Sequence, residues 1–264
     1  MDLQLSGQLA LVTASTAGIG LAIGSTLAAE NATVVINGRS EKRVVEAIEN
    51  IRQKHPHAKL EAFVGDLSTV AGVKQAINSV PPVDILVNNL GYYEPKAFED
   101  IADEDWIAII ETNFMSGVRL SRYYLPKMKA KNCGRIIFIS SESAINIPVE
   151  MIHYGVTKTM QLALARGLAE TTAGTGVTVN SILAGPTRSE GVEGFVSKMA
   201  KSRNVEPSLV EKEFFETVRP SSLLKRFATT EEVAALVAFV ASPLSSATNG
   251  TALRADGGVV RSII

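Results

Sequence analysis

LALVTASTAGIG, residues 9–20, sets the architecture of this chain. Four apolar residues predict a buried strand, a turn with two closely spaced glycines follows, and helical composition begins at Leu21. A tight turn from strand to helix points free backbone N–H groups and the positive end of the helix dipole at an anion such as a diphosphate. Glycine turns also simply end strands, so the turn alone leaves a nucleotide site and a plain turn open. The candidate cofactor contacts here are Ser15, Thr16, Gly18, Ile19 and Gly20, and the first two could instead cap the helix.

The same alternation of strand and helix continues along the chain. Short apolar runs predict strands at Leu9–Val12, Thr33–Ile36, Leu60–Val64, Asp84–Val87, Arg135–Ile139 and Val177–Ile182. Helical composition separates them at Leu21–Glu30, Glu41–Lys54, Asp105–Lys131 and His153–Thr172. Strands that are apolar on both faces, joined through helices, predict an α/β fold with a doubly wound, mainly parallel sheet that helices cover on both sides. No linker or repeat divides the chain, so residues 1–264 are expected to form a single domain.

Composition excludes several classes of function. The 264 residues include 26 Lys+Arg and 27 Asp+Glu, for a net charge of -1, which gives no electrostatic reason to bind nucleic acid or an anionic membrane. The single cysteine, Cys133, excludes an internal disulfide and a cysteine zinc cluster. His55 and His57 have no third ligand nearby in sequence, so we expect no metal site. No signal sequence or apolar stretch of about 18 residues is present, and a cytoplasmic location is the expectation.

The segment from about 190 to 227 departs from this alternation. Apolar residues such as Phe195 and Phe215 are interleaved with charges, which predicts one or two amphipathic helices lying outside the sheet. An excursion of this size is often a lid or binding segment, so we expect it to cover a substrate; a surface insertion with no binding role is the alternative.

Polar residues follow the second and third predicted strands. An acidic residue after the second strand would bind a ribose 2′-hydroxyl and favour NAD, but Arg39 stands there instead. Its guanidinium suits a 2′-phosphate, which favours NADP, although it could also be a solvated arginine at a helix start. Asp66 and Leu67 follow the third strand, where the carboxylate could accept from an adenine amino group or cap a helix.

Ser141 ends one predicted strand, and Tyr154 and Lys158 open the next helix. Residues four apart lie on one helix face, about 5–6 Å apart at Cβ. An ammonium there favours the phenolate form of a tyrosine whose ordinary pKa is about 10. Such a tyrosine can exchange a proton with a carbonyl or alcohol oxygen, and the serine hydroxyl can hold that oxygen. A solvated helix pair is the alternative meaning of this spacing.

In the order and spacing of these motifs the chain resembles the classical short-chain dehydrogenases/reductases from about Gly7 to Gly258. The shared features are the glycine turn, Asn88-Asn89-Leu90-Gly91, Asn113, Ser141, Tyr154-x-x-x-Lys158 and the closing turn Asp256-Gly257-Gly258. The resemblance implies a Rossmann-type sheet of seven strands and hydride transfer between NADP or NAD and an alcohol or ketone carbon. It also implies a homotetramer or homodimer.

The resemblance assigns expected roles residue by residue. Tyr154 is the general acid/base, Lys158 lowers its pKa and holds the nicotinamide ribose, and Ser141 positions the substrate oxygen. Asn113 is expected to hold a water of a proton relay. The further cofactor positions are Asn88 near the ribose, the close-approach glycine Gly91, and Gly185 and Thr187 in the loop over the nicotinamide.

Three positions depart from the family pattern. Ala14 replaces a glycine, Leu90 a small residue and Ala184 a proline, which bears on cofactor affinity more than on chemistry. One alternative is therefore a non-catalytic, dinucleotide-binding regulatory protein of the same fold. Another, a sugar-nucleotide epimerase or dehydratase, usually has a larger carboxyl-terminal domain. Loops after the strands are expected to rim a cleft for a small, partly hydrophobic substrate, through Tyr92, Tyr93, Glu142, Ile147 and Glu150. Trp106 is expected to pack, and His153 to line the pocket or lie in solvent.

Overall fold

The computed structural model describes residues 1–263 and, within them, contains one sheet of seven strands in the order β3-β2-β1-β4-β5-β6-β7. All six pairs of neighbouring strands are parallel. The strands are β1 (Leu9–Val12), β2 (Thr33–Gly38), β3 (Lys59–Val64), β4 (Ile85–Asn88), β5 (Gly134–Ser141), β6 (Val177–Ala184) and β7 (Ala252–Ala255). The predicted doubly wound α/β sheet is confirmed. From β1 to β3 the strands are added toward one side of the sheet, and from β4 onward they are added toward the other. Ligands bind beyond the carboxyl ends of the strands at such a switch point, here between β1 and β4.

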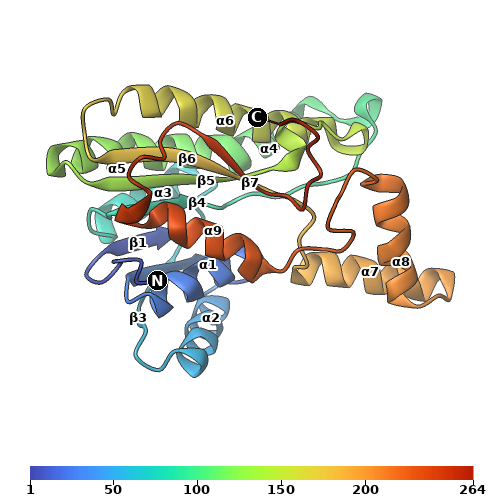
Figure 1. The fold of residues 1–264 in the computed structure, drawn as a ribbon, viewed down its shortest axis with the longest axis horizontal. Coiled ribbons are helices and arrows are strands. Elements are labelled where there is room, and N and C mark those ends of the chain that lie inside the picture. The colour runs from blue at the N-terminus through green and yellow to red at the C-terminus, as the bar shows by residue number, and fades with distance from the viewer. Residues whose placement is uncertain (264) are drawn as a thin grey trace.

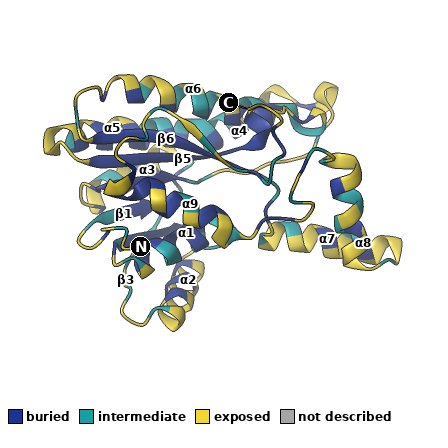
Figure 2. Ribbon diagram, viewed as in Figure 1, coloured by how far each residue is buried: buried dark blue, intermediate teal, exposed yellow. Residues whose placement is uncertain are grey.

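Helices cover the sheet in two layers (Figure 1). One layer consists of α1 (Gly18–Ala29), α2 (Glu41–Lys54) and α9 (Thr230–Ala241), which share an apolar core with one face of the strands. The other contains α3 (Val70–Ser79), α5 (Ser116–Lys131) and α6 (Ile152–Glu170), with a second core. Successive residues of β1 enter opposite cores, Ala10 and Val12 in the first and Leu11 in the second. This is why the central strands read as continuous apolar runs and are buried in Figure 2. The edge strands β3 and β7 are partly exposed.

One helix predicted at Asp105–Lys131 is interrupted, which corrects that expectation. α4 (Asp103–Ile110) passes into a π-helical turn, η2 (Glu111–Met115), and α5 begins only at Ser116. A π turn widens the backbone by one residue and frequently occurs at functional sites. Asn113 lies in its middle, so the interruption bears directly on the site.

The segment after β6 forms a small body outside the sheet, which we call the α7–η5 body. It contains α7 (Glu190–Arg203), α8 (Pro207–Glu213) and a π-helical turn, η5 (Phe214–Val218), and it projects from the sheet in Figure 1. Its own apolar core consists of Val196, Ala200, Val210, Phe215 and Phe227. The base is closed where Thr187 pairs with Ala228 in an isolated parallel bridge. The predicted helices outside the sheet are confirmed, whereas their role as a substrate lid stays a prediction.

The remaining elements are short. They are the 3-10 turns η1 (Phe98–Asp100), η3 (Glu142–Ala144), η4 (Val149–Met151) and η6 (Pro243–Ser245). Among residues 1–263, no helix has the length and apolar character needed to cross a bilayer.

Candidate active site

Ser141, Tyr154 and Lys158 meet beyond the carboxyl end of β5. Ser141 is the last residue of that strand, and the other two lie one turn apart near the start of α6. Tyr154 is hydrogen-bonded to Ser141, and Lys158 Nζ lies 5.6 Å from the centre of the tyrosine ring. The structure therefore brings together three side chains of which the first and last, Ser141 and Lys158, are 17 residues apart in sequence.

Burial is the largest influence on the pKa values of Lys158 and Tyr154. The Lys158 side chain is almost completely enclosed and donates a hydrogen bond to the Ile139 carbonyl at 2.9 Å. Burial lowers the pKa of Lys158 to about 8. Burial also raises the pKa of Tyr154; the hydrogen bond to Ser141 opposes this rise, and the nearby charge of Glu142 adds to it. The predicted role of Lys158, lowering the pKa of Tyr154, stays a prediction.

Asn113 is held rigidly in the π-helical turn. Its side chain accepts a hydrogen bond from Tyr92 N at 2.9 Å and donates to Tyr92 O at 2.9 Å. The backbone carbonyl of Asn113 accepts from Gln161 Nε2 at 2.6 Å. The relay water expected at Asn113 stays a prediction.

Gly91 lies in the loop after β4, next to Asn113 and Lys158. A Cβ added at Gly91 would lie 3.3 Å from Asn113 Oδ1 and 3.4 Å from Lys158 Nζ. The glycine thus lets the loop approach the lysine closely, and its expected close approach to a cofactor stays a prediction. The side chain of Asn88 is buried and donates to Ser121 Oγ of α5 at 3.3 Å, and its expected place near the ribose stays a prediction.

The glycine turn is held by a strained residue. Ala14, which stands where a glycine is usual, has a φ of +51°, a left-handed conformation that costs an ordinary residue about 1–2 kcal/mol. Asn37 stabilises it by accepting from Ala14 N at 3.0 Å. Gly20 cannot be replaced without displacement, because an added Cβ would lie 2.4 Å from the Ala14 carbonyl.

Ser15 and Thr16 differ in what they can offer a ligand. Ser15 is fully buried, donates to the Val12 carbonyl at 2.8 Å and accepts from Asn37 N at 2.9 Å, so its hydroxyl belongs to the scaffold and not to a phosphate. Neither hydroxyl caps α1, whose N-cap is Ala17. Thr16 is partly exposed and has no hydrogen-bond partner among residues 1–263. Gly18 and Ile19 start the helix, so their uncapped N–H groups are free for an anion.

Three residues that sequence reasoning missed join the strands at the switch point. Asn37 donates to the carbonyls of Phe63 and Gly65 and so ties β2 to the end of β3. Thr13 accepts from the backbone N–H groups of Asn89 and Leu90 through its hydroxyl, and Asn89 donates back to the Thr13 carbonyl at 2.9 Å. Their signal in sequence was only a polar residue at the end of an apolar strand.

The adenosine side of the predicted site is more open. Arg39 follows β2, is exposed and has no partner among the described residues. Asp66 Oδ1 accepts from Ser68 N at 3.0 Å and from Ser68 Oγ at 2.7 Å. The alternative that Asp66 caps a helix is wrong, because Thr69 is the N-cap of α3. An adenine contact of the carboxylate stays a prediction. Leu67 is buried in the second core.

The loop after β6 is fastened to the closing turn of the chain. Gly185 N donates to the Ala255 carbonyl at 3.1 Å, and Thr187 Oγ1 donates to the Gly185 carbonyl at 2.9 Å. Asp256 accepts from Gly258 N and Val260 N, each at 3.0 Å. Ala184, one of the departures, is buried and pairs with Ser141, while Leu90 packs toward the second core.

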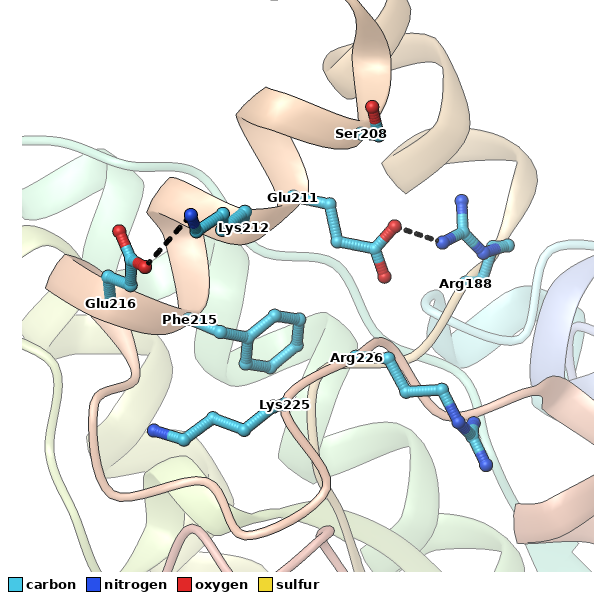
Figure 3. Close-up of a pocket in the computed structure, with 8 residues that line it drawn as sticks. All are labelled: Arg188, Ser208, Glu211, Lys212, Phe215, Glu216, Lys225 and Arg226. Atoms are coloured by element: carbon cyan, nitrogen blue, oxygen red, sulfur yellow. Dashed lines mark hydrogen bonds and ion pairs between the residues drawn. The ribbon is translucent and has the colours of Figure 1, made fainter.

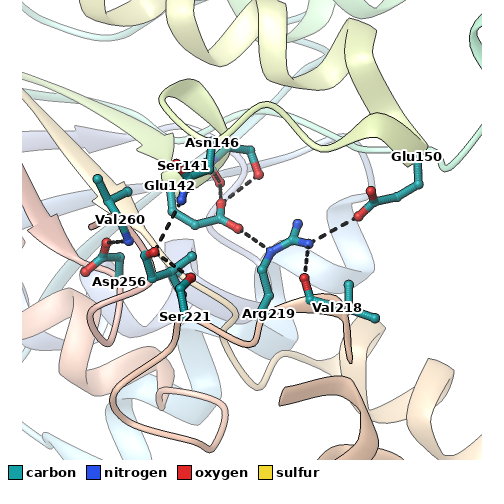
Figure 4. Close-up of polar contacts among 12 residues, drawn as sticks. Ser141, Glu142, Asn146, Glu150, Val218, Arg219, Ser221, Asp256 and Val260 are labelled. Carbon is teal, nitrogen blue, oxygen red and sulfur yellow. Dashed lines mark hydrogen bonds and ion pairs between the residues drawn. The ribbon is translucent and has the colours of Figure 1, made fainter. Parts of the chain in front are cut away.

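Glu142 differs most from expectation. It was expected at the rim of a cleft but is only 3% exposed, directly after Ser141. Figure 4 shows its carboxylate between Ser141 and Arg219, which also reaches Glu150. His153 is likewise buried, against Trp106, and does not line a pocket or lie in solvent. Tyr92, Tyr93 and Ile147 remain exposed.

A cavity of about 790 Å³ opens beneath α8, away from Tyr154. Four cations and two carboxylates line it, as Figure 3 shows. Arg188 is paired with Glu211 at 2.5 Å, and Lys225 donates to the Pro220 carbonyl at 2.8 Å. Because these groups already have partners in the protein, the cavity has less to offer a ligand than the cluster at β5.

The chain is similar to known oxidoreductases over its whole length. Residues 13–260 match the family described as Enoyl-(Acyl carrier protein) reductase. The chain is 49% identical to the uncharacterized oxidoreductase YvaG of Bacillus subtilis, with 100% of both chains covered. It is 32% identical to D-beta-hydroxybutyrate dehydrogenase of Cupriavidus necator, covering 97% of this chain and 99% of the other. The structure of L-sorbose reductase from Gluconobacter frateurii, complexed with NADPH and L-sorbose, superposes with a TM-score of 0.93 at 29% identity over 100% of both chains.

Proposed function

The chain belongs to the short-chain dehydrogenase/reductase family and is an NAD(P)-dependent oxidoreductase, and from this premise we propose that Tyr154 is its general acid/base. The substrate is an alcohol or ketone, and a proton moves between Tyr154 and the oxygen on the reacting carbon. The observation that carries this proposal is the convergence of Ser141, Tyr154 and Lys158 at the carboxyl end of β5.

The residues at the switch point fit a dinucleotide. The N-terminus of α1 has no side-chain cap and no acidic residue in its first turn, so it suits a diphosphate. Thr16 is available as a further donor, and the unpaired guanidinium of Arg39 suits a 2′-phosphate, which favours NADP. The bound nicotinamide supplies or accepts the hydride.

The remaining chemistry belongs to side chains of the protein. In reduction, Tyr154 donates its phenolic proton to the oxygen that gains charge, and in oxidation it removes that proton. Lys158 places a positive charge beside this position, which stabilises the phenolate that remains. Ser141 provides a second hydrogen-bonding group that orients the oxygen.

The substrate class is a small secondary alcohol or ketone. The L-sorbose and D-beta-hydroxybutyrate named in the similar proteins both carry such a group. In this chain, exposed aromatic and aliphatic side chains near Tyr154 favour a partly hydrophobic substrate; Tyr93 packs edge-on against the tyrosine at 6.0 Å.

A carbonyl and alcohol screen that follows nicotinamide absorbance, paired with Tyr154→Phe, tests the proposal. We expect the variant to lose turnover by at least about 100-fold, the usual contribution of a positioned acid/base, while NADPH binding measured by fluorescence stays near that of the wild type. A variant as fast as the wild type on a verified substrate would remove Tyr154 from the mechanism. Loss of NADPH binding would indicate a folding defect, and Thr157→Ser on the same helix serves as the folding control.

We further propose that the protein self-associates, as a homotetramer or homodimer, through the outer faces of α5 and α6. A groove of about 300 Å³ between them is lined mainly by apolar groups, among them Val118, Leu125, Leu164 and Leu168. Sedimentation velocity should give a mass that is a multiple of 28.1 kDa, and a stable monomer would contradict this.

A further inference from the structure

The carboxylate of Glu142 is surrounded by hydrogen-bond donors. Oε2 accepts from Ser141 Oγ at 2.5 Å and from Ser143 Oγ at 2.6 Å, and Oε1 accepts from Arg219 Nε at 2.8 Å. Two of these donors are hydroxyls and the third is a guanidinium, so both carboxylate oxygens have partners. A buried charge is tolerated only with such partners, so this cluster is a built arrangement and not a chance contact.

The hydroxyl of Ser141 is already engaged as a donor to Glu142. A serine has one proton to donate, and here that proton is directed at Glu142. The Ser141 oxygen also accepts from Ser143 N at 3.1 Å. Ser141 can therefore donate to Tyr154 or to a substrate only when its hydrogen bond to Glu142 is broken.

Arg219 connects this cluster to the segment outside the sheet. It follows directly after η5, is 13% exposed at its side chain, and donates to Glu150 Oε1 at 3.3 Å as well as to Glu142. In Figure 4 the guanidinium lies between the two carboxylates. The position of the α7–η5 body is thus coupled to the residue that holds the catalytic serine.

We propose that Glu142 and Arg219 form a positioning pair for the reaction, in which Glu142 competes with Tyr154 for the proton of Ser141 and Arg219 sets the strength of that competition from the end of the α7–η5 body. The inference deepens the proposed function and rests on its assignment of Tyr154. Neither residue is a catalytic residue, because both act through Ser141 and Tyr154.

The pair has a signature that a purely structural role lacks. Tyr154 is faced by Glu142 and Ser141 after β5, by Tyr93 after β4, by Arg219 after η5 and by Lys158 on its own helix. The negative charge of Glu142 favours the neutral phenol, whereas the positive charge of Arg219 favours the phenolate. Removing the two charges should therefore move the ionisation of Tyr154 in opposite directions.

The test compares Glu142→Gln with Arg219→Gln. Glu142→Gln leaves a single acceptor oxygen for the three donors around it, so the hydrogen bond that holds the Ser141 hydroxyl is weakened. In alcohol oxidation the rate rises with pH as Tyr154 ionises; we expect this limb about 1 pH unit lower in Glu142→Gln and higher in Arg219→Gln. We also expect kcat to fall about 10-fold or more in each, because the Glu142–Arg219 pair no longer fixes the position of the Ser141 oxygen. Arg219→Lys should restore the limb, and Arg203→Gln, which removes an exposed arginine of α7 paired with Glu213, should leave it unchanged.

An ultraviolet difference titration of the NADP complex, with Tyr154→Phe as the reference, measures the same ionisation without turnover. Shifts of opposite sign by this readout support the pair even if no substrate is turned over, in which case the proposed function fails alone. Variants that bind NADP but show no shift, or shifts of the same sign, overturn the pair. Should Glu142→Gln fail to bind NADP, Arg219→Gln and Arg219→Lys decide the matter by themselves.

Discussion

Lys158 illustrates how a side chain with a proposed role in the reaction can oppose stability. Its ammonium lies in an environment that lowers its pKa to about 8, with burial as the cause. Below that pH the folded protein holds a poorly solvated charge that the unfolded chain exposes to water. A site that needs a positive charge beside a phenol therefore carries a cost in free energy of unfolding.

Replacing this lysine should expose that cost. Lys158→Met should abolish turnover but raise the free energy of unfolding at neutral pH by about 1–2 kcal/mol, after a discount for the hydrogen bond lost to Ile139. Because the folded pKa is lowered, the unfolded state binds more protons between about pH 8 and the ordinary lysine pKa of ~10.4, so wild-type stability rises with pH there and the gain shrinks. Urea unfolding at neutral and alkaline pH measures this.

The matched control for that experiment is Lys74→Met, which removes an exposed lysine of α3. It should change stability by less than about 0.5 kcal/mol at either pH. Equal responses of the two variants would show that burial of Lys158 carries no stability cost.

Arg39 should decide the choice between cofactors. Because its guanidinium is exposed and has no partner within residues 1–263, Arg39→Ala should weaken NADPH binding by about 10-fold or more and leave NADH binding nearly unchanged. Titration of each nucleotide by fluorescence measures the ratio. Arg52→Ala, at the far end of α2, is the control, and an Arg39→Ala protein with undiminished discrimination would assign the phosphate to another group.

At the scale of the elements, the α7–η5 body has a core of its own. Three aromatic rings, Phe214, Phe215 and Phe227, pack within about 5 Å of each other, separate from the two cores on the sheet. A small core of this kind opens more readily than the sheet does, because few apolar contacts hold it. The body can therefore loosen while the sheet stays folded.

Phe215→Ala should let the α7–η5 body unfold separately from the sheet. The ring is 2% exposed, so its removal should cost the body about 3–5 kcal/mol. We expect faster cleavage by protease between residues 190 and 218 and a higher KM, while the main unfolding transition changes little. Phe195→Ala on α7, where the side chain is 53% exposed, should behave as the wild type. A lower midpoint for the whole protein without faster local cleavage would show that the body and the sheet unfold as one unit.

At the scale of the whole molecule, parallel strand order explains why distant residues meet. Four neighbouring strands point the same way, namely β1, β4, β5 and β6. The glycine turn, Gly91, Ser141 and Gly185 therefore all lie at the carboxyl ends of these strands. A dinucleotide lying across the carboxyl ends of these strands would contact residues from at least three of them. Its binding should therefore stabilise the whole fold.

Thermal unfolding with nucleotide measures that coupling. At a concentration 100-fold above Kd, NADPH should add about 2.7 kcal/mol, which corresponds to roughly 5–10 °C in Tm for a protein of this size. Tyr154→Phe should keep this increase, since the proposal assigns the hydroxyl to chemistry. An increase with NADH that equals the increase with NADPH at the same concentration would contradict the preference for NADP.

The order of strands and helices, the parallel sheet and the grouping of Ser141, Tyr154 and Lys158 could be predicted from sequence, because they depend on local periodicity and on residues close in the chain. Periodicity did not reveal the π turn at Asn113, since the composition of residues 105–131 stays helical through the interruption. Nor did it separate the buried hydroxyl of Ser15 from the free one of Thr16, which are neighbours of similar chemistry.

The residue types alone predicted the parallel α/β sheet and a dinucleotide site with a phenol and an ammonium beside it, and the structure confirms the sheet. Only the folded arrangement decided which polar groups serve the scaffold. Asn37, Thr13 and Asn89 became ties between strands, and Glu142 became a buried partner of Ser141 and Arg219, which lies 77 residues away in the chain. The reason is that the partner of a polar side chain depends on distances set by packing, and sequence separation carries no information about them.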